Sequence, residues 1–191
     1  WKIIEEGFNP DNNRASESIF SLGNGKMGQR ANFEEEYTGD TLKGNYIGGI
    51  YYPDKTKVGW WKNGYPEYYA KVLNAPNWIG IKIEIDGTSL DLSKCEVVEF
   101  KRILNMKEGY LKRQFSAILP GKKNVRVDAI RILSLTHNEI GAIKYELTPL
   151  NFSGNFKITM DLDADVYNED ANYDEKFWLE QLQHEAPVRR S

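Results

Sequence analysis

The sequence predicts a mainly β protein, a large antiparallel β-sandwich with little helix, and three observations support this fold class. Apolar and polar residues alternate along several stretches of the second half, as they do in half-buried strands. These stretches recur at roughly ten-residue spacing, separated by short segments with turn chemistry. The strand–helix alternation of a parallel sheet is absent.

The clearest strand follows Trp78, where apolar and polar residues alternate from Ile79 to Asp86. Asp86-Gly87 supplies a turn, and Leu90–Leu92 is expected to return beside this strand. The later candidate strands are each followed by turn residues, and they cover residues 97–104, 110–119, 125–135, 142–150 and 155–163.

Other parts of the chain lack this alternation. A single helix is expected over Tyr173–Leu182, where four apolar residues fit one face. The first roughly seventy residues are rich in Gly, Asn, Tyr and Trp, and long loops of this kind usually serve a function or cover something.

Composition excludes several classes of protein. The 191 residues suit one domain, with 40% hydrophobic and 28% charged residues. No run reaches the ~18 apolar residues of a membrane span, and the net charge of -3 is spread without a basic stripe for nucleic acid. Cys95 is the single cysteine, which fits a reducing, cytoplasmic location. The Asn151-Phe-Ser153 sequon is expected to be unmodified.

The stretch "SLGNGKMGQR" contains Gly23-x-Gly25-x-x-Gly28, the spacing of the dinucleotide-binding fingerprint. That fingerprint requires a helix directly afterwards, and Asn32 and Gly39 leave little room for one. We therefore expect these glycines to serve tight turns and close backbone packing between short strands.

The same residues resemble a known family. "ESIFSLGNGKMGQRANFEE" (Glu17 to Glu35) is similar to the N-terminal signature of glycoside hydrolase family 65, although Lys26 and Ala31 depart from its usual form. Three further segments match family segments in the same order: "GDTLKGNYIGGIYY", "VLNAPNW" and "LTPLNFSG". The family comprises phosphorylases of maltose, trehalose, kojibiose, nigerose and related glucosides, together with some hydrolases.

The resemblance implies that residues 1–191 form an N-terminal super-sandwich, a galactose mutarotase-like β-sandwich. In the family this domain precedes a helical linker and an (α/α)6 barrel, which is absent here and holds the catalytic glutamic acid. The resemblance implies no metal or organic cofactor, and inorganic phosphate as co-substrate if the whole protein is a phosphorylase. Because the chain starts at Trp1 and the family's sandwich is usually longer, we expect a piece of a larger protein.

The expected role of such a domain is structural. It would support its own C-terminal catalytic barrel, shape the active-site entrance and take part in a homodimer, with carbohydrate as the ligand of the whole enzyme. Whether the chain by itself is an enzyme stays open. No catalytic carboxylate is assigned, because glycoside cleavage needs carboxyl groups that flank the bond.

Aromatic residues between Tyr46 and Trp78 form the most informative cluster, because aromatic faces stack on sugars and also fill protein interfaces. A stand-alone carbohydrate-binding module using this cluster is the alternative function. Glu67 could instead be an ordinary residue of a surface loop. Asn24 and Arg30 could instead stabilise turns. The candidate sugar-contacting residues are Asn24, Arg30, Trp60, Trp61, Tyr65, Glu67 and Trp78.

Three other patterns yield no site. The run Glu34–Glu36 is expected to be a solvated face. Asp161, Asp163 and Asp165 share one strand face and could bind Ca²⁺, but a polar strand edge is the preferred interpretation. The two histidines and Cys95 do not provide a nucleophilic triad or a zinc set, so no metal site is assigned.

Overall fold

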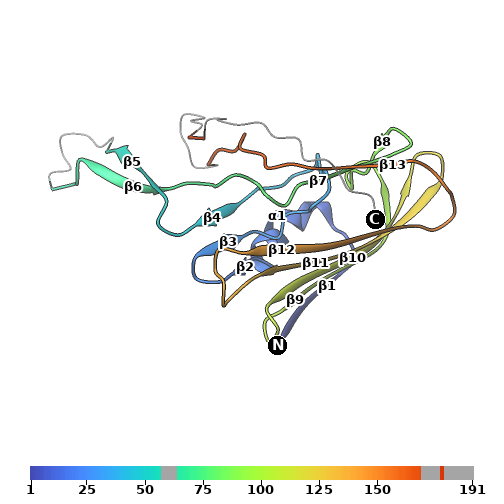
Figure 1. Cartoon of the computed structure of the whole chain (residues 1–191), viewed down its shortest axis with the longest axis horizontal. Helices are drawn as coiled ribbons and strands as arrows, with labels where there is room; N and C mark the ends of the chain where they lie inside the picture. The colour runs from blue at the N-terminus through green and yellow to red at the C-terminus, as the bar shows by residue number, and fades with distance from the viewer. Residues whose placement is uncertain (57–63, 169–176, 179–191) are drawn as a thin grey trace.

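Antiparallel strands arranged in two facing layers form the body of the computed structural model, which describes residues 1–56, 64–168 and 177–178 (Figure 1). This confirms the predicted mainly β fold class. The lower layer in Figure 1 is a five-stranded sheet in the order β1-β9-β10-β11-β12. Its strands are β1 (Lys2–Glu6), β9 (Glu96–Asn105), β10 (Tyr110–Leu119), β11 (Lys123–Leu133) and β12 (Gly141–Pro149).

The facing layer contains a three-stranded sheet in the order β13-β7-β8. It comprises β13 (Phe156–Met160), β7 (Ile81–Ile85) and β8 (Thr88–Ser89). The predicted turn is confirmed: Asp86 and Gly87 have φ of 48° and 79°, as a two-residue hairpin requires. The return strand β8 begins two residues earlier than the expected Leu90–Leu92, and the N–H of Leu90 still donates to the carbonyl of Ile83 on β7 (2.9 Å). Both leucines are buried in the core.

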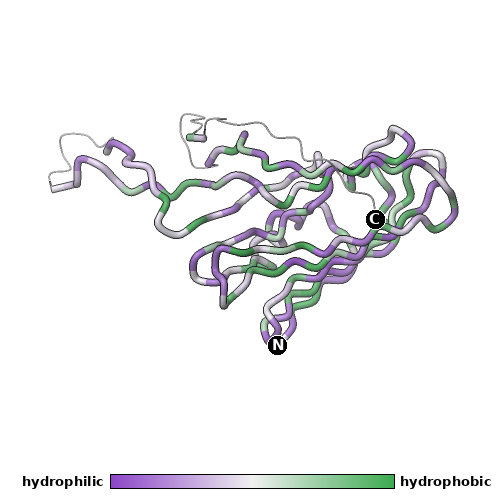
Figure 2. Tube along the Cα trace, in the orientation of Figure 1, coloured by the Kyte–Doolittle hydropathy of each residue, from purple (hydrophilic) through white to green (hydrophobic). Residues whose placement is uncertain are grey.

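The main core lies between these two sheets. Alternate residues of each strand face inward, and Figure 2 shows the corresponding alternation of hydropathy along the strands. The core cluster consists of Phe33, Ile81, Ile83, Ile85, Leu90, Leu92, Phe100, Phe115, Ala117, Leu119, Val125 and Val127. A second cluster joins the first third of the chain to the large sheet through Phe20, Leu22, Ala31, Leu104, Leu111 and Leu133.

The first third of the chain is more regular than its sequence suggests. It contributes β1, a 3-10 turn at Pro10–Asn12 and helix α1 (Asn13–Ile19). The strands that follow are β2 (Leu22–Gly23), β3 (Met27–Gln29), β4 (Asn45–Ile47), β5 (Tyr51–Lys55) and β6 (Tyr68–Val72). The sequence missed these elements because they are too short for a periodic pattern, and because β5 and β6 expose both faces.

Strands β5 and β6 form a hairpin that extends away from the two layers, and we call it the arm (Figure 1). The helix expected over Tyr173–Leu182 lies outside the described residues, except for Phe177 and Trp178, which are not helical. Within the described ranges no helix is long and apolar enough to cross a membrane.

Candidate functional site

The glycine motif lies in the β2–β3 hairpin, where Gly23 and Gly28 face each other in register. Gly25 has φ of 85° in the turn, a conformation that glycine adopts without steric cost. The tight turn expected of these glycines is confirmed, but the close backbone packing is not, because a Cβ at Gly25 or Gly28 would meet no atom within 4 Å. A helix N-terminus that could hold a pyrophosphate does not follow the motif.

Asn24 organises this hairpin and ties it to the large sheet. Its Oδ1 accepts hydrogen bonds from the backbone N–H groups of Lys26 (3.1 Å) and Met27 (2.7 Å). Its Nδ2 donates to the carbonyls of Ser134 (2.8 Å) and Asn138 (3.1 Å) in the β11–β12 turn. Both ends of the amide are therefore used within the domain.

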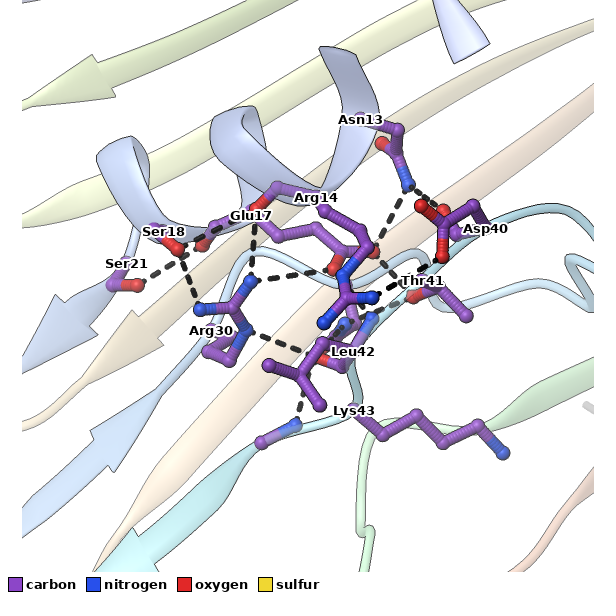
Figure 3. Close-up of polar contacts among 12 residues, drawn as sticks. Asn13, Arg14, Glu17, Ser18, Ser21, Arg30, Asp40, Thr41, Leu42 and Lys43 are labelled. Carbon is purple, nitrogen blue, oxygen red and sulfur yellow. Dashed lines mark hydrogen bonds and ion pairs between the residues drawn. The ribbon is translucent and has the colours of Figure 1, made fainter. Parts of the chain in front are cut away.

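Arg30 lies at the centre of a polar network beneath α1 (Figure 3). Its Nε donates to the carbonyl of Leu42 (2.9 Å), and its Nη2 donates to the carbonyl of Arg14 (2.9 Å). The same Nη2 lies 3.5 Å from a carboxylate oxygen of Glu17, which is fully buried. A Cβ at Gly44 would approach Arg30 Cδ to 2.4 Å, so only glycine fits beside this side chain.

Glu17 receives donors from several loops in this network. Asn13 Nδ2 (3.0 Å), the Leu42 N–H (2.9 Å) and the Thr41 hydroxyl all donate to its carboxylate. A buried carboxylate is tolerated when it is paired and hydrogen-bonded in this way. The Arg30–Glu17 network thus fixes residues 40–44, which lead into β4 and the arm.

The acidic run Glu34–Glu36 was predicted to be a solvated face, and for its first two residues that prediction is wrong. Glu34 and Glu35 are each only 4% exposed. Arg113 Nη2 donates to Glu34 (2.5 Å) and to Glu35, and Arg131 Nε donates to Glu34 (3.0 Å). The acids can be buried because two buried guanidinium groups neutralise them.

The electrostatics of this ion cluster exclude Glu34 as a general acid at neutral pH. Burial disfavours its charged form, but the charges and hydrogen bonds of Arg131 and Arg113 outweigh that effect and lower its pKa to about 2. A general acid must instead hold a proton near the working pH. Tyr145 also donates to Glu35 (2.9 Å), and burial followed by the negative charge of Glu35 raises the pKa of this phenol well above its usual value.

The arm carries the aromatic residues expected to contact sugar. Its exposed tyrosines do not form one platform, because opposed residues share a face and neighbours alternate. Tyr51 and Tyr68 belong to one face of the hairpin, and Tyr52 and Tyr69 belong to the other. All four are at least 42% exposed. The arm therefore exposes aromatic rings on both faces, although on one face the Tyr52 ring also packs against the Phe177 ring, with centroids 4.6 Å apart.

The remaining predicted contacts are dispersed. Tyr65 and Glu67 are exposed near the tip of the arm, and the Tyr65 ring lies 6.4 Å from that of Tyr69. Trp60 and Trp61 lie outside the described residues. Trp78 is half-buried against the second core cluster, where its ring abuts Gly141. Among the predicted contacts that the structure describes, Asn24, Arg30 and Trp78 lie in the body of the domain and Tyr65 and Glu67 on the arm, so these five do not form one site.

The aspartates after β13 are engaged with lysines and backbone. Asp161 pairs with Lys82 (2.6 Å), and Asp163 lies 3.7 Å from Lys43 and accepts a hydrogen bond from the backbone of Asp165. The segment is polar as expected, but the three aspartates do not share a strand face, because β13 ends at Met160 and only Asp163 forms a β-bridge, with Asn77. Among the described residues, no group of three or more His, Cys, Asp or Glu side chains is placed to hold a metal ion.

A profile described as "Glycosyl hydrolase family 65, N-terminal domain" matches residues 3–190. The chain belongs to this family. Maltose phosphorylase of Bacillus subtilis is 48% identical over 181 residues, which are 95% of this chain and 24% of that protein. Kojibiose phosphorylase of Thermoanaerobacter brockii is 36% identical over 88% of the chain and 20% of that protein.

A solved structure described as a putative kojibiose phosphorylase from human microbiome has a similar fold. It matches this family 65 domain with a TM-score of 0.80 and 30% identity, covering 87% of this chain and 22% of that chain. The domain therefore spans about a fifth to a quarter of the length of these relatives. This proportion is consistent with a further domain on the C-terminal side in such enzymes.

Proposed function

We propose that this domain is the scaffold of a disaccharide phosphorylase that cleaves an α-glucosyl disaccharide with inorganic phosphate. The observation that carries the proposal is the 48% identity to a maltose phosphorylase over 95% of this chain. Maltose is accordingly the first substrate to test. In this proposal the catalytic groups belong to the remaining part of the enzyme, without a metal or organic cofactor.

The use of polar groups supports a structural role. Asn24, Arg30, Glu34 and Glu35 all bond within the domain, although they lie in its most family-like segment. A catalytic carboxylate needs access to a substrate, and the two glutamates are buried beneath the sheet. The Arg30–Glu17 network also holds residues 40–44, which lead to the arm, so it helps to determine where the arm leaves the body of the domain.

The arm is the part that we propose meets the rest of the enzyme, at the active-site entrance or at a dimer contact. The Tyr51→Ser and Tyr52→Ser variants test this, because the two rings occupy opposite faces of the hairpin. An arm enclosed between two bodies predicts that both variants weaken dimerisation or raise KM. A one-sided sugar groove predicts an effect of only one of them. If neither variant changes KM or the dimer constant, the arm has no such role.

The activity is tested on the whole polypeptide that carries this domain. Maltose, kojibiose and trehalose are incubated with and without inorganic phosphate, and glucose 1-phosphate and glucose are measured. A phosphorylase releases both products only when phosphate is present. Glucose release at the same rate without phosphate would identify a hydrolase, and no turnover of any disaccharide would contradict the proposal.

A carbohydrate-binding role is the second candidate, and a groove of about 520 Å³ favours it. Phe8 and Tyr37 provide aromatic walls, and Asp11 and Asp40 provide acceptors for sugar hydroxyls. Calorimetric titration of the folded domain with maltose, kojibiose, trehalose and glucose tests this role. Binding that Asp11→Ala weakens would support it, because Asp11 is an exposed residue lining the groove, and the absence of heat would exclude it.

A further inference from the structure

Asn74 lies at the base of the arm, two residues beyond the end of β6, and all of its polar groups are hydrogen-bonded. Its side-chain Oδ1 accepts a hydrogen bond from the N–H of Asn45 (2.9 Å), and its Nδ2 donates to the carbonyl of Lys43 (3.0 Å). In return, Asn45 Nδ2 donates to the carbonyl of Pro76 (2.8 Å). Asn45 begins β4, which leads on to β5. The two stretches of chain that enter and leave the arm are therefore bonded to each other at its base.

The segment 163–168, which follows β13, lies along the residues that follow the arm. Asp163 and Asn77 exchange two backbone hydrogen bonds in an antiparallel bridge (2.7 and 2.9 Å). Further along, the side chain of Asn168 takes the place of a strand residue. Its Oδ1 accepts from the N–H of Asn74 (2.8 Å), and its Nδ2 donates to the carbonyl of the last residue of β6 (2.6 Å). The base of the arm is thereby bonded to this segment as well.

The direction of the arm depends on this junction. In the described part of the chain β5 and β6 are hydrogen-bonded only to each other, and an isolated two-stranded hairpin is only marginally stable. Asn45, Asn74 and Asn168 are 3%, 6% and 8% exposed, so water cannot replace a partner that is lost. Trp178 Nε1 also donates to the Asn74 carbonyl (2.8 Å). Because the partners of Asn74 come from separate segments of the chain, these buried bonds restrict the base of the arm to one geometry.

We infer that Asn74 is a positioning residue of the enzyme: it joins the base of the arm to the segment 163–168 and so fixes the direction in which the arm meets the rest of the polypeptide. The inference rests on the role proposed for the arm. Asn74 itself is buried, and it acts through the exposed rings of the arm, among them Tyr51. The competing interpretation is that Asn74 contributes only to stability.

Amide exchange of the whole polypeptide tests whether Asn74 holds the arm. In Asn74→Ala, exchange along 68–72 and 163–168 should be faster than in wild type by ~10-fold or more, with β10 unchanged because the large sheet stays folded. Asn168→Asp is a milder variant, since it keeps the acceptor for the Asn74 N–H and loses only the donor to β6. It should accelerate exchange in the same two segments.

Asn151→Ala is the matched control. The Asn151 amide also uses both of its ends, accepting from the N–H of Asn124 (2.8 Å) and donating to the carbonyl of Lys122 (2.9 Å), but it lies on the β12–β13 connection. Its loss should leave exchange in the arm unchanged. The inference is overturned if Asn74→Ala and Asn168→Asp both leave the arm at the wild-type rate, or if Asn151→Ala accelerates it equally.

Kinetics distinguish positioning from stability. Whichever constant Tyr51→Ser raises, the KM for maltose or the dimer dissociation constant, Asn74→Ala should raise by ~10-fold, with kcat nearly unchanged. Because Asn74 acts through the arm, adding Asn74→Ala to Tyr51→Ser should give no further rise. Effects that multiply, or a loosened arm with both constants unchanged, would overturn the inference. A wild-type enzyme that does not phosphorolyse maltose would contradict the proposed function, whereas exchange and the dimer constant would still decide the inference.

Discussion

The buried ion cluster around Glu34 allows a quantitative prediction. Replacing Glu34 by Gln keeps the shape of the side chain but leaves Arg113 and Arg131 short of one negative charge in a site that water does not reach. Breaking a buried pair by removing one partner costs about 3–5 kcal/mol. We expect the free energy of unfolding of E34Q to be lower by this amount at pH 7. Urea denaturation followed by circular dichroism measures it.

The pH dependence provides an independent check. The pKa of Glu34 is lowered from 4.5 to about 2 in the folded state, which corresponds to about 3 kcal/mol. A lowered carboxyl pKa stabilises the fold above the unfolded pKa, and that stability is lost as the pH falls from 4.5 towards 2. The gap between wild type and E34Q should therefore narrow by about 2 kcal/mol between pH 7 and pH 3.

Glu36 provides the matched control, because it belongs to the same acidic run but is exposed. Glu36→Gln should leave the free energy of unfolding within ~1 kcal/mol of wild type at both pH values. A Glu34→Gln variant as stable as Glu36→Gln, with an unchanged pH profile, would refute the assignment of a buried, ionised cluster.

Two further substitutions probe packing and the network beneath α1. Gly141→Ala should lower the free energy of unfolding by about 1–3 kcal/mol, because its Cβ would lie 2.6 Å from the Trp78 ring. In Gly28→Ala the new Cβ would meet no atom within 4 Å, so this control should be near neutral. Thermal melting compares the two variants. Arg30→Met should lower the free energy of unfolding by about 2–3 kcal/mol, because it removes donors to a buried carboxylate and two carbonyls. Arg126→Met breaks only an exposed ion pair and should lower it by less than ~1 kcal/mol. Urea titration measures both free energies of unfolding. Equal losses in the two arginine variants would show that Arg30 has only a peripheral role in stability.

The second half of the fold could be predicted from the sequence, because each long strand there has one buried face. The ends of the strands β9 to β13 lie within about three residues of the predicted ranges. The first third could not be predicted in this way. Its strands of two to five residues are positioned by side chains such as Asn24 and Arg30, whose partners are distant in the chain.

The ion cluster was missed, although the sequence contains a signal for it. Arg113 stands between Leu111 and Phe115 in the period-two pattern, and Arg131 occupies the inward parity of β11. An arginine at an inward position of a strand needs a buried acid. The acidic run was interpreted in isolation, and pairing it with these two arginines would have predicted its burial.

The buried charges hold the first third of the chain in one position relative to the large sheet. A buried ion pair adds little net stability over an apolar core, but an unpaired buried charge is strongly destabilising. The fold is therefore stable only when the charged partners are in register. Here Arg113 and Arg131 hold Glu34 against the large sheet, and Arg131 Nη2 also donates to the carbonyl of Asn32 (2.7 Å). The segment that carries Arg30 and the arm is thereby fixed to one side of the sheet.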